Sequence, residues 1–220
     1  MKQKLLALTL ALTLLLSGCQ LNIQPEGTTF AYALLCSRYF GEVSEEYTRL
    51  ALASPEQATE DYEDMVAAEM VFLCGYFGVA AENADQASLR RFVEVAYGRI
   101  SFLVGQQQVG DGVISVPVTV QPLRLFDHIG KEEYMAVVGP LWEQFGAADG
   151  TGLSALSAAQ RSRYERAYLS EILAMVEGRL AEAAYGEART VTLRLEQDGD
   201  YYRPNAEDLA AIHALTLRYE

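Results

Sequence analysis

Apolar side chains recur every three or four residues along much of the chain, which predicts amphipathic helices. The clearest helix begins after Ser54, a capping residue followed by Pro55 at the first helical position and by Gln57 at the capping-box position. Its apolar stripe comprises Ala58, Tyr62, Met65, Val66, Phe72, Leu73 and Tyr76. Further helices are predicted over residues 28–41, 85–97, 127–145, 157–185 and 205–219. The helix that Asp127 caps is expected to be interrupted at Gly139-Pro140.

The spacing of apolar residues changes from helical to alternating in two places, which predicts two β-hairpins. They join residues 100–104 to 116–120 and residues 191–195 to 201–202. The turns are Gly110-Asp111-Gly112 in the first hairpin and Asp198-Gly199-Asp200 in the second. Pro117 has no N–H to donate, so its strand is predicted to be an edge strand or to carry a bulge there.

The order helices, hairpin, helices, hairpin, helix predicts an α+β fold with helices packed on a small antiparallel sheet. A chain of 220 residues that is 50% hydrophobic has ample material for a core. No domain-sized linker or internal repeat interrupts it. We therefore expect a single α+β domain over residues 28–220.

Residues 1–18 have the pattern of a cleavable targeting segment. Lys2 and Lys4 precede an apolar run over residues 5–16, which reaches only ~18 Å as a helix and is too short for a ~30 Å hydrocarbon core. The run ends in Leu16-Ser17-Gly18-Cys19, which resembles the lipobox of bacterial lipoproteins. That resemblance implies cleavage before Cys19 and a thioether link from its thiol to diacylglycerol. The alternative is a conventional secretory signal that leaves Cys19 a free thiol.

Residues 19–27 are predicted to be the lipidated N-terminus and a short tether. Two acyl chains are enough for durable attachment, so no transmembrane helix is required. The expected location is the extracytoplasmic face of the cell membrane, held through the diacylglyceryl-cysteine. Fully extended, the eight residues after Cys19 span less than ~30 Å, which keeps the folded body near the bilayer.

The chain as a whole resembles uncharacterised lipoproteins of Gram-positive bacteria whose body is an NTF2-like or cystatin-like α+β domain. The features that carry the resemblance are the lipobox, the acidic helical stretches at residues 44–47 and 54–57, the hairpin ending at residues 116–123, and Asp198-Gly199-Asp200-Tyr201-Tyr202 before a final helix. The resemblance implies an exported, membrane-tethered domain. It supplies no catalytic residues.

The chain is strongly acidic, with a formal charge of −13 and 17 basic against 30 acidic residues. Phosphate backbones are recognised by clustered lysine and arginine, so this balance argues against a nucleic-acid partner. On net charge alone, a cationic, neutral or metal-bearing partner is favoured over an anionic one.

Cys36 and Cys74 lie in a compartment that permits disulfides once the chain is exported. Each lies 19 residues from Pro55, so a helical hairpin that turns there would bring them level. A bridge closing such a loop would contribute ~3 to 4 kcal/mol to stability. The alternative is two small buried hydrophobic residues, and a break at Gly41 would spoil the alignment.

No motif in the chain specifies a reaction, a metal or a cofactor. The two histidines, His128 and His213, lie in no metal-binding frame, and neither a nucleophile elbow nor a phosphate-binding glycine loop is present. We expect no metal site and no cofactor. Trp142, Tyr201 and Tyr202 could line a ligand groove, with core packing as the alternative.

The leading functional hypothesis is a membrane-anchored binding or interaction module for an envelope protein or a small ligand. The alternative is an envelope enzyme that uses a carboxylate in an NTF2-like pocket. A buried acid in a concave site would distinguish the second hypothesis from the first.

Overall fold

A computed structural model describes residues 26–110, 112–127, 129–146 and 152–219. The predictions for the signal segment, Cys19 and His128, and for the tether up to residue 25, lie outside the described residues. In the described ranges, no helix combines the length and the apolarity needed to cross a bilayer.

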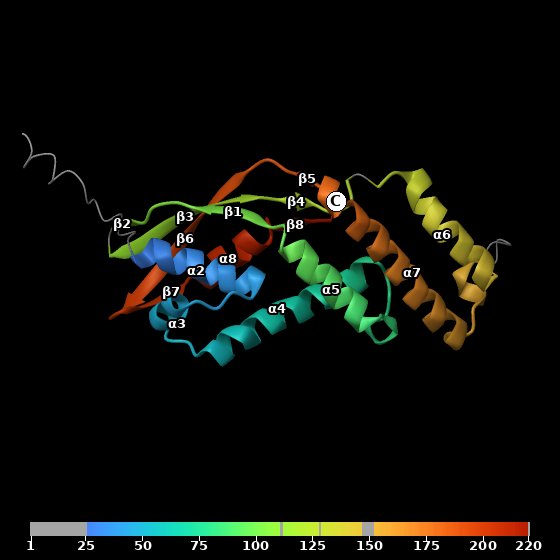
Figure 1. The fold of residues 1–220 in the computed structure, drawn as a ribbon, viewed down its shortest axis with the longest axis horizontal. Helices are drawn as coiled ribbons and strands as arrows, with labels where there is room; N and C mark the ends of the chain where they lie inside the picture. The colour runs from blue at the N-terminus through green and yellow to red at the C-terminus, as the bar shows by residue number, and fades with distance from the viewer. Residues whose placement is uncertain (1–25, 111, 128, 147–151, 220) are drawn as a thin grey trace, which may run out of the picture.

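The larger of two sheets is curled and antiparallel, and β3 runs through its middle (Figure 1). Its strands are β1 (Ser101–Val104), β2 (Gln108–Gly110), β3 (Val113–Gln121), β6 (Arg189–Asp198) and β7 (Tyr201–Pro204). The order is β1-β3-β6-β7, and β2 also pairs with β3. Both predicted hairpins are confirmed, and pairing of β3 with β6 joins them into one sheet.

Of the two alternatives for Pro117, the edge strand is wrong, because β3 has neighbours on both sides. Opposite Pro117 the register shifts by one residue, from Val104 paired with Val118 to Gln108 paired with Ser115, which places the extra residue of a bulge in the partner segment. On one side β1 pairs as far as Val118 and β2 resumes the pairing at Ser115. Pro117 faces the break between these two short strands, where a missing N–H costs no ladder bond. A proline therefore fits inside a central strand here.

A second, three-stranded sheet is not predicted by the sequence pattern. It contains β4 (Leu123–Arg124), β5 (Ala184–Tyr185) and β8 (Leu217–Arg218), in the order β5-β4-β8 with β4 and β8 parallel. The last helix was expected to continue to residue 219, but α8 (Ala206–His213) ends early. The chain then turns, and the Thr216 carbonyl accepts a hydrogen bond from the Leu123 N–H at 2.8 Å.

Seven α-helices complete the described fold. Besides α8 they are α2 (Glu26–Phe40), α3 (Glu45–Ala51), α4 (Pro55–Tyr76), α5 (Gln86–Tyr97), α6 (Lys131–Phe145) and α7 (Ala158–Arg179). Helices α2, α3 and α8 contact the larger sheet, whose buried face presents Val116, Val118 and Leu193. Helices α6 and α7 form a pair at the end of the molecule away from β7 (Figure 1).

Helices α4 and α7 begin where the sequence predicts, because capping side chains bond to the first N–H groups of each helix. The Ser54 Oγ accepts from the Gln57 N–H, and Ser157 and Gln160 form a reciprocal capping box. The start of α6 is different, because it begins at Lys131 and Asp127 forms an ion pair with Arg124 instead of a cap. The helix also continues through Pro140 to Phe145, so the expected interruption is absent.

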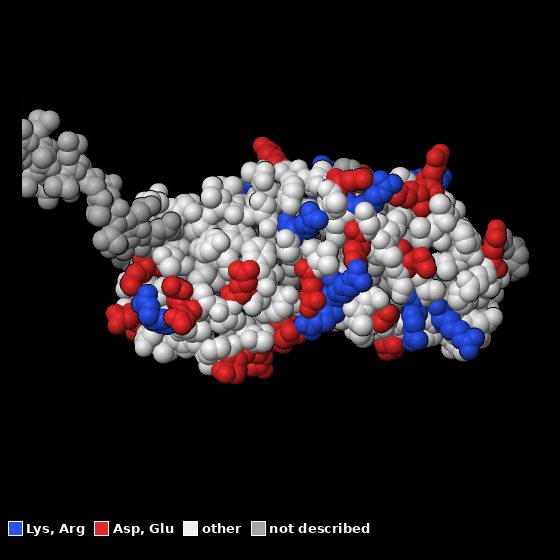
Figure 2. Space-filling model, viewed as in Figure 1, with Lys and Arg blue, Asp and Glu red and all other residues white. Residues whose placement is uncertain are grey.

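Charged side chains are unevenly spread over the molecular surface. On the face in Figure 2, acidic groups gather near α3 and the start of α4, whereas basic groups are concentrated over α5 and α7. Although the net charge of the chain is negative, parts of its surface therefore carry mainly basic side chains.

Candidate functional site

The three aromatic residues proposed to share a groove lie in different parts of the fold. Trp142 is on α6, whereas Tyr201 and Tyr202 are on β7 at the opposite end of the molecule (Figure 1). The Trp142 Nε1 donates to the Tyr164 hydroxyl at 3.2 Å. The Tyr202 ring is buried and stacks on Phe30. Tyr201 is exposed, so the structure brings no shared groove together.

Cys36 and Cys74 are both free and both buried, on α2 and α4. Gly41, with φ +67°, follows the end of α2 at Phe40, and this is the break that spoils the level alignment of the two cysteines. Burial raises the pKa of both thiols. They are placed as small buried hydrophobic residues, the alternative reading of the sequence.

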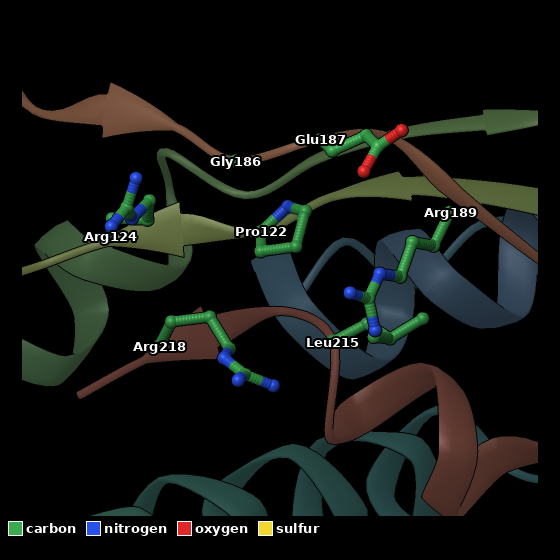
Figure 3. Close-up of a pocket in the computed structure, with 7 residues that line it drawn as sticks. All are labelled: Pro122, Arg124, Gly186, Glu187, Arg189, Leu215 and Arg218. Carbon is green, nitrogen blue, oxygen red and sulfur yellow. The ribbon is translucent and has the colours of Figure 1, made fainter. Parts of the chain in front are cut away.

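A cavity of about 370 Å³ lies where the small sheet meets the start of β6. Seven residues line it: Pro122, Arg124, Gly186, Glu187, Arg189, Leu215 and Arg218. They come from three stretches of the chain that are far apart in sequence, residues 122–124, 186–189 and 215–218 (Figure 3). The volume is within the usual range for small-molecule sites.

Backbone pairing between strands sets the positions of the main-chain atoms of the cavity's arginines. Arg124 and Arg218 are register partners in the parallel pair of β4 and β8, so their Cα atoms lie side by side. The Leu125 N–H donates to the Arg218 carbonyl at 3.1 Å, and the Gly186 N–H donates to the Pro122 carbonyl at 2.8 Å. The second bond holds the chain beside β4 as it leads into Arg189 at the start of β6.

The cavity concentrates positive charge in an acidic protein. Three guanidinium groups line it against a single carboxylate, that of Glu187, and Arg124 also has an ion pair with Asp127. In Figure 3 the side chains of Arg189 and Arg218 extend toward the same space beside Leu215. Guanidinium forks match the planar oxygens of carboxylates and phosphates, so the chemistry of this lining suits an anion.

The side chains around the cavity are guanidinium groups, one carboxylate and apolar groups. The side chains that line the cavity include no histidine, cysteine, serine or threonine that could act as a nucleophile or as a base near neutral pH. Across the described ranges, no three His, Cys, Asp or Glu side chains come together in a way that could hold a metal ion.

Sequence reasoning missed this site because its residues belong to very short strands. Arg124 and Arg218 each stand between two apolar residues, in Leu-Arg-Leu at 123–125 and Leu-Arg-Tyr at 217–219. This alternation of apolar and basic residues is typical of a short β-strand. It does not reveal that the two segments pair.

The fold and the site define a mixed α+β protein with a curled antiparallel sheet and an arginine-lined cavity. No family model matches the chain, and no curated protein matches it either. Among solved structures, it is similar to ycdA, a candidate lipoprotein of Bacillus subtilis, with a TM-score of 0.56 and 12% sequence identity. The match covers 88% of this chain, which spans 56% of the ycdA chain. At this identity the likeness establishes a shared fold.

Proposed function

We propose that this protein is a lipid-anchored module that binds a small anion outside the cytoplasm. Arg124, Arg189 and Arg218 would hold the carboxylate or phosphate groups of the ligand. The observation that carries the proposal is that three arginines line one cavity of the small sheet and that two of them, Arg189 and Arg218, extend toward the same space (Figure 3).

Local charge outweighs net charge at such a site. The negative charge of the whole protein is spread over its surface, and salt screens it beyond ~8 Å at physiological ionic strength. A ligand inside the cavity meets guanidinium groups at contact distance. The net charge then acts against nonspecific binding of anions elsewhere on the surface.

Titration of the mature protein in detergent with sodium phosphate, glycerol phosphate and succinate tests the ligand class. We expect saturable heat from at least one probe, weakened about tenfold by Arg189→Gln because a charge-assisted hydrogen bond is lost. Arg163→Gln, which changes an exposed arginine of α7, is the matched control and should leave the affinity unchanged. Equal affinity in the wild type and in Arg189→Gln would contradict the proposal.

The proposal also includes lipid attachment at Cys19 and an NTF2-like or cystatin-like fold class. The lipobox at Leu16-Ser17-Gly18-Cys19 and the likeness to ycdA both favour anchoring through Cys19. The order of helices and hairpins favours the NTF2-like or cystatin-like class. Fractionation of cells that express the wild type or Cys19→Ser tests the anchor. We expect the wild type in the membrane fraction and the variant released from it.

A further inference from the structure

A second cavity, separate from the arginines, contains the buried carboxylate of Glu69. Glu69 lies on α4 and is 6% exposed. Its Oε2 accepts a hydrogen bond from the Tyr97 hydroxyl at 3.0 Å, and its Oε1 accepts one from the Tyr219 hydroxyl. Burial, followed by the nearby carboxylate, raises the pKa of both tyrosines, so both hydroxyls stay protonated and donate.

The carboxylate has no permanent cationic partner at contact distance in the described parts of the chain. The one basic group in an ion-pair contact with it is His213, whose Nε2 lies 3.7 Å from Oε2. Burial lowers the pKa of His213, which disfavours the charged form of the imidazole beside Glu69. Arg38 lies close enough to act electrostatically on Tyr39, Tyr97 and His213, but within the described ranges it forms no ion pair with Glu69.

The cavity beside Glu69 has a volume of about 340 Å³. Its walls include Phe72, His213, Thr216 and Tyr219, together with the aliphatic residues Ala68, Ala214 and Leu217. Phe72 is half exposed at 51% and contacts Tyr219 with ring centroids 4.9 Å apart. The His213 ring stacks on Tyr39, which holds the imidazole in place.

The two hydroxyl donors of this cavity are already used, whereas the Glu69 carboxylate keeps acceptor positions open. The Tyr219 hydroxyl proton is used on Glu69, and the Thr216 hydroxyl donates to the His213 carbonyl at 2.7 Å. An ionised carboxylate offers about four acceptor positions, and tyrosine hydroxyls occupy two of those on Glu69. A complementary ligand therefore donates hydrogen bonds and carries positive charge.

We propose that this cavity binds a small primary ammonium ion, with Glu69 as its counter-ion and Phe72 and Tyr219 as aromatic walls. Aromatic faces attract ammonium groups within ~6 Å of the ring centroid. The negative charge of the protein also draws cations toward the surface. Both Glu69 oxygens already accept hydrogen bonds, which holds the carboxylate in a fixed position at the wall of the cavity.

Calorimetric titration of the mature protein with n-butylammonium chloride tests this second site. n-Butanol serves as the neutral analogue, and tetramethylammonium as a cation without N–H donors. We expect saturable binding of butylammonium, weaker binding of tetramethylammonium and none of butanol. Glu69→Gln should reduce the butylammonium affinity about tenfold or more. Glu60→Gln, on the exposed side of the same helix, should leave it unchanged.

Phe72→Leu guards against a folding defect in the Glu69 variant, because Phe72 is half exposed and its replacement leaves the core intact. It should lower the butylammonium affinity several-fold. Equal binding of butanol and butylammonium, or unchanged affinity in folded Glu69→Gln or in Phe72→Leu, would overturn the inference. Arg189→Gln should not affect butylammonium binding, so this site and the proposed anion site can fail separately.

Discussion

At the scale of single residues, Gly105 and Pro117 together allow a break in the central sheet. The Gly105 N–H donates to the Pro117 carbonyl at 2.7 Å, but proline cannot return the bond. The Gly105 carbonyl instead accepts from the Thr28 hydroxyl at 3.3 Å, and the same hydroxyl accepts from the Gln107 N–H at 2.8 Å. The Thr28 hydroxyl from α2 thus bonds to two backbone groups that have no strand partner where β1 ends.

Gly105→Ala should be destabilising, because a Cβ at this position would lie 2.6 Å from the Pro117 Cγ and 3.3 Å from its carbonyl oxygen. We expect a loss of about 1 to 3 kcal/mol in the free energy of unfolding, measured by urea denaturation. Gly110→Ala is the control, since nothing lies within 4 Å of its added Cβ. Equal losses in the two variants would show that the contact with Pro117 is not the cause.

The position of Glu69 in the sequence already indicates a buried carboxylate. It lies four residues after Met65 and four before Leu73, inside the stripe that the helical spacing assigns to the core. A lone carboxylate in such a stripe requires buried hydrogen-bond donors. Those donors, Tyr97 and Tyr219, lie 28 and 150 residues away, so the sequence pattern alone cannot supply them.

At the scale of elements, the features that could be predicted were those with local causes. Ser54, Ser157 and Asn205 cap their helices as expected, because a cap bonds to an N–H only two or three residues further on. The two hairpins follow from alternation around glycine-containing turns.

The small sheet could not be predicted, because its strands have only two residues each and no period can be read from them. What stabilises these strands is pairing between segments about 60 to 95 residues apart, such as Leu123 with Tyr185 and with Leu217. The arginine cavity is built on this sheet. Sequence reasoning therefore missed the site together with the element that carries it.

The docking of α8 onto β6 should depend on pH through Asp208. Its carboxylate accepts from the Arg194 N–H at 2.9 Å and from the guanidinium Nε and Nη2 at 2.8 Å. These hydrogen bonds lower the pKa of Asp208 below its ordinary value of 3.8. The stabilisation is then complete above that value and is lost as the pH falls through the lower folded-state pKa.

Asp208→Asn should therefore lower the melting temperature near neutral pH, and the difference from the wild type should shrink as the pH falls below 3.8. Thermal unfolding followed by circular dichroism at a series of pH values measures this difference. Asp200→Asn, in the exposed turn between β6 and β7, is the control. A gap between wild type and Asp208→Asn that stays constant from neutral to acid pH would contradict the role given to this carboxylate.

At the scale of the whole molecule, the last described residues separate the two cavities. Leu215 and Arg218 line the arginine cavity, whereas Thr216, Leu217 and Tyr219 line the cavity of Glu69. Pairing of β8 with β4 holds this segment in place. This strand and the residue after it thus position Arg218 in one cavity and the Tyr219 hydroxyl, a donor to Glu69, in the other.

Leu217→Ala should disturb both cavities, because Leu217 is buried at 7% exposure and lies directly before Arg218 and Tyr219. We expect a stability loss of about 2 to 5 kcal/mol, as for other buried leucines, and several-fold weaker binding of both phosphate and butylammonium. Leu193→Ala is the matched control, since this leucine is fully buried on β6 and lines neither cavity. It should cost similar stability and, at a temperature where both variants are folded, leave both affinities unchanged. Equal effects of the two substitutions on binding would mean that β8 does not position the two sites, because general loosening of the core would then explain the loss.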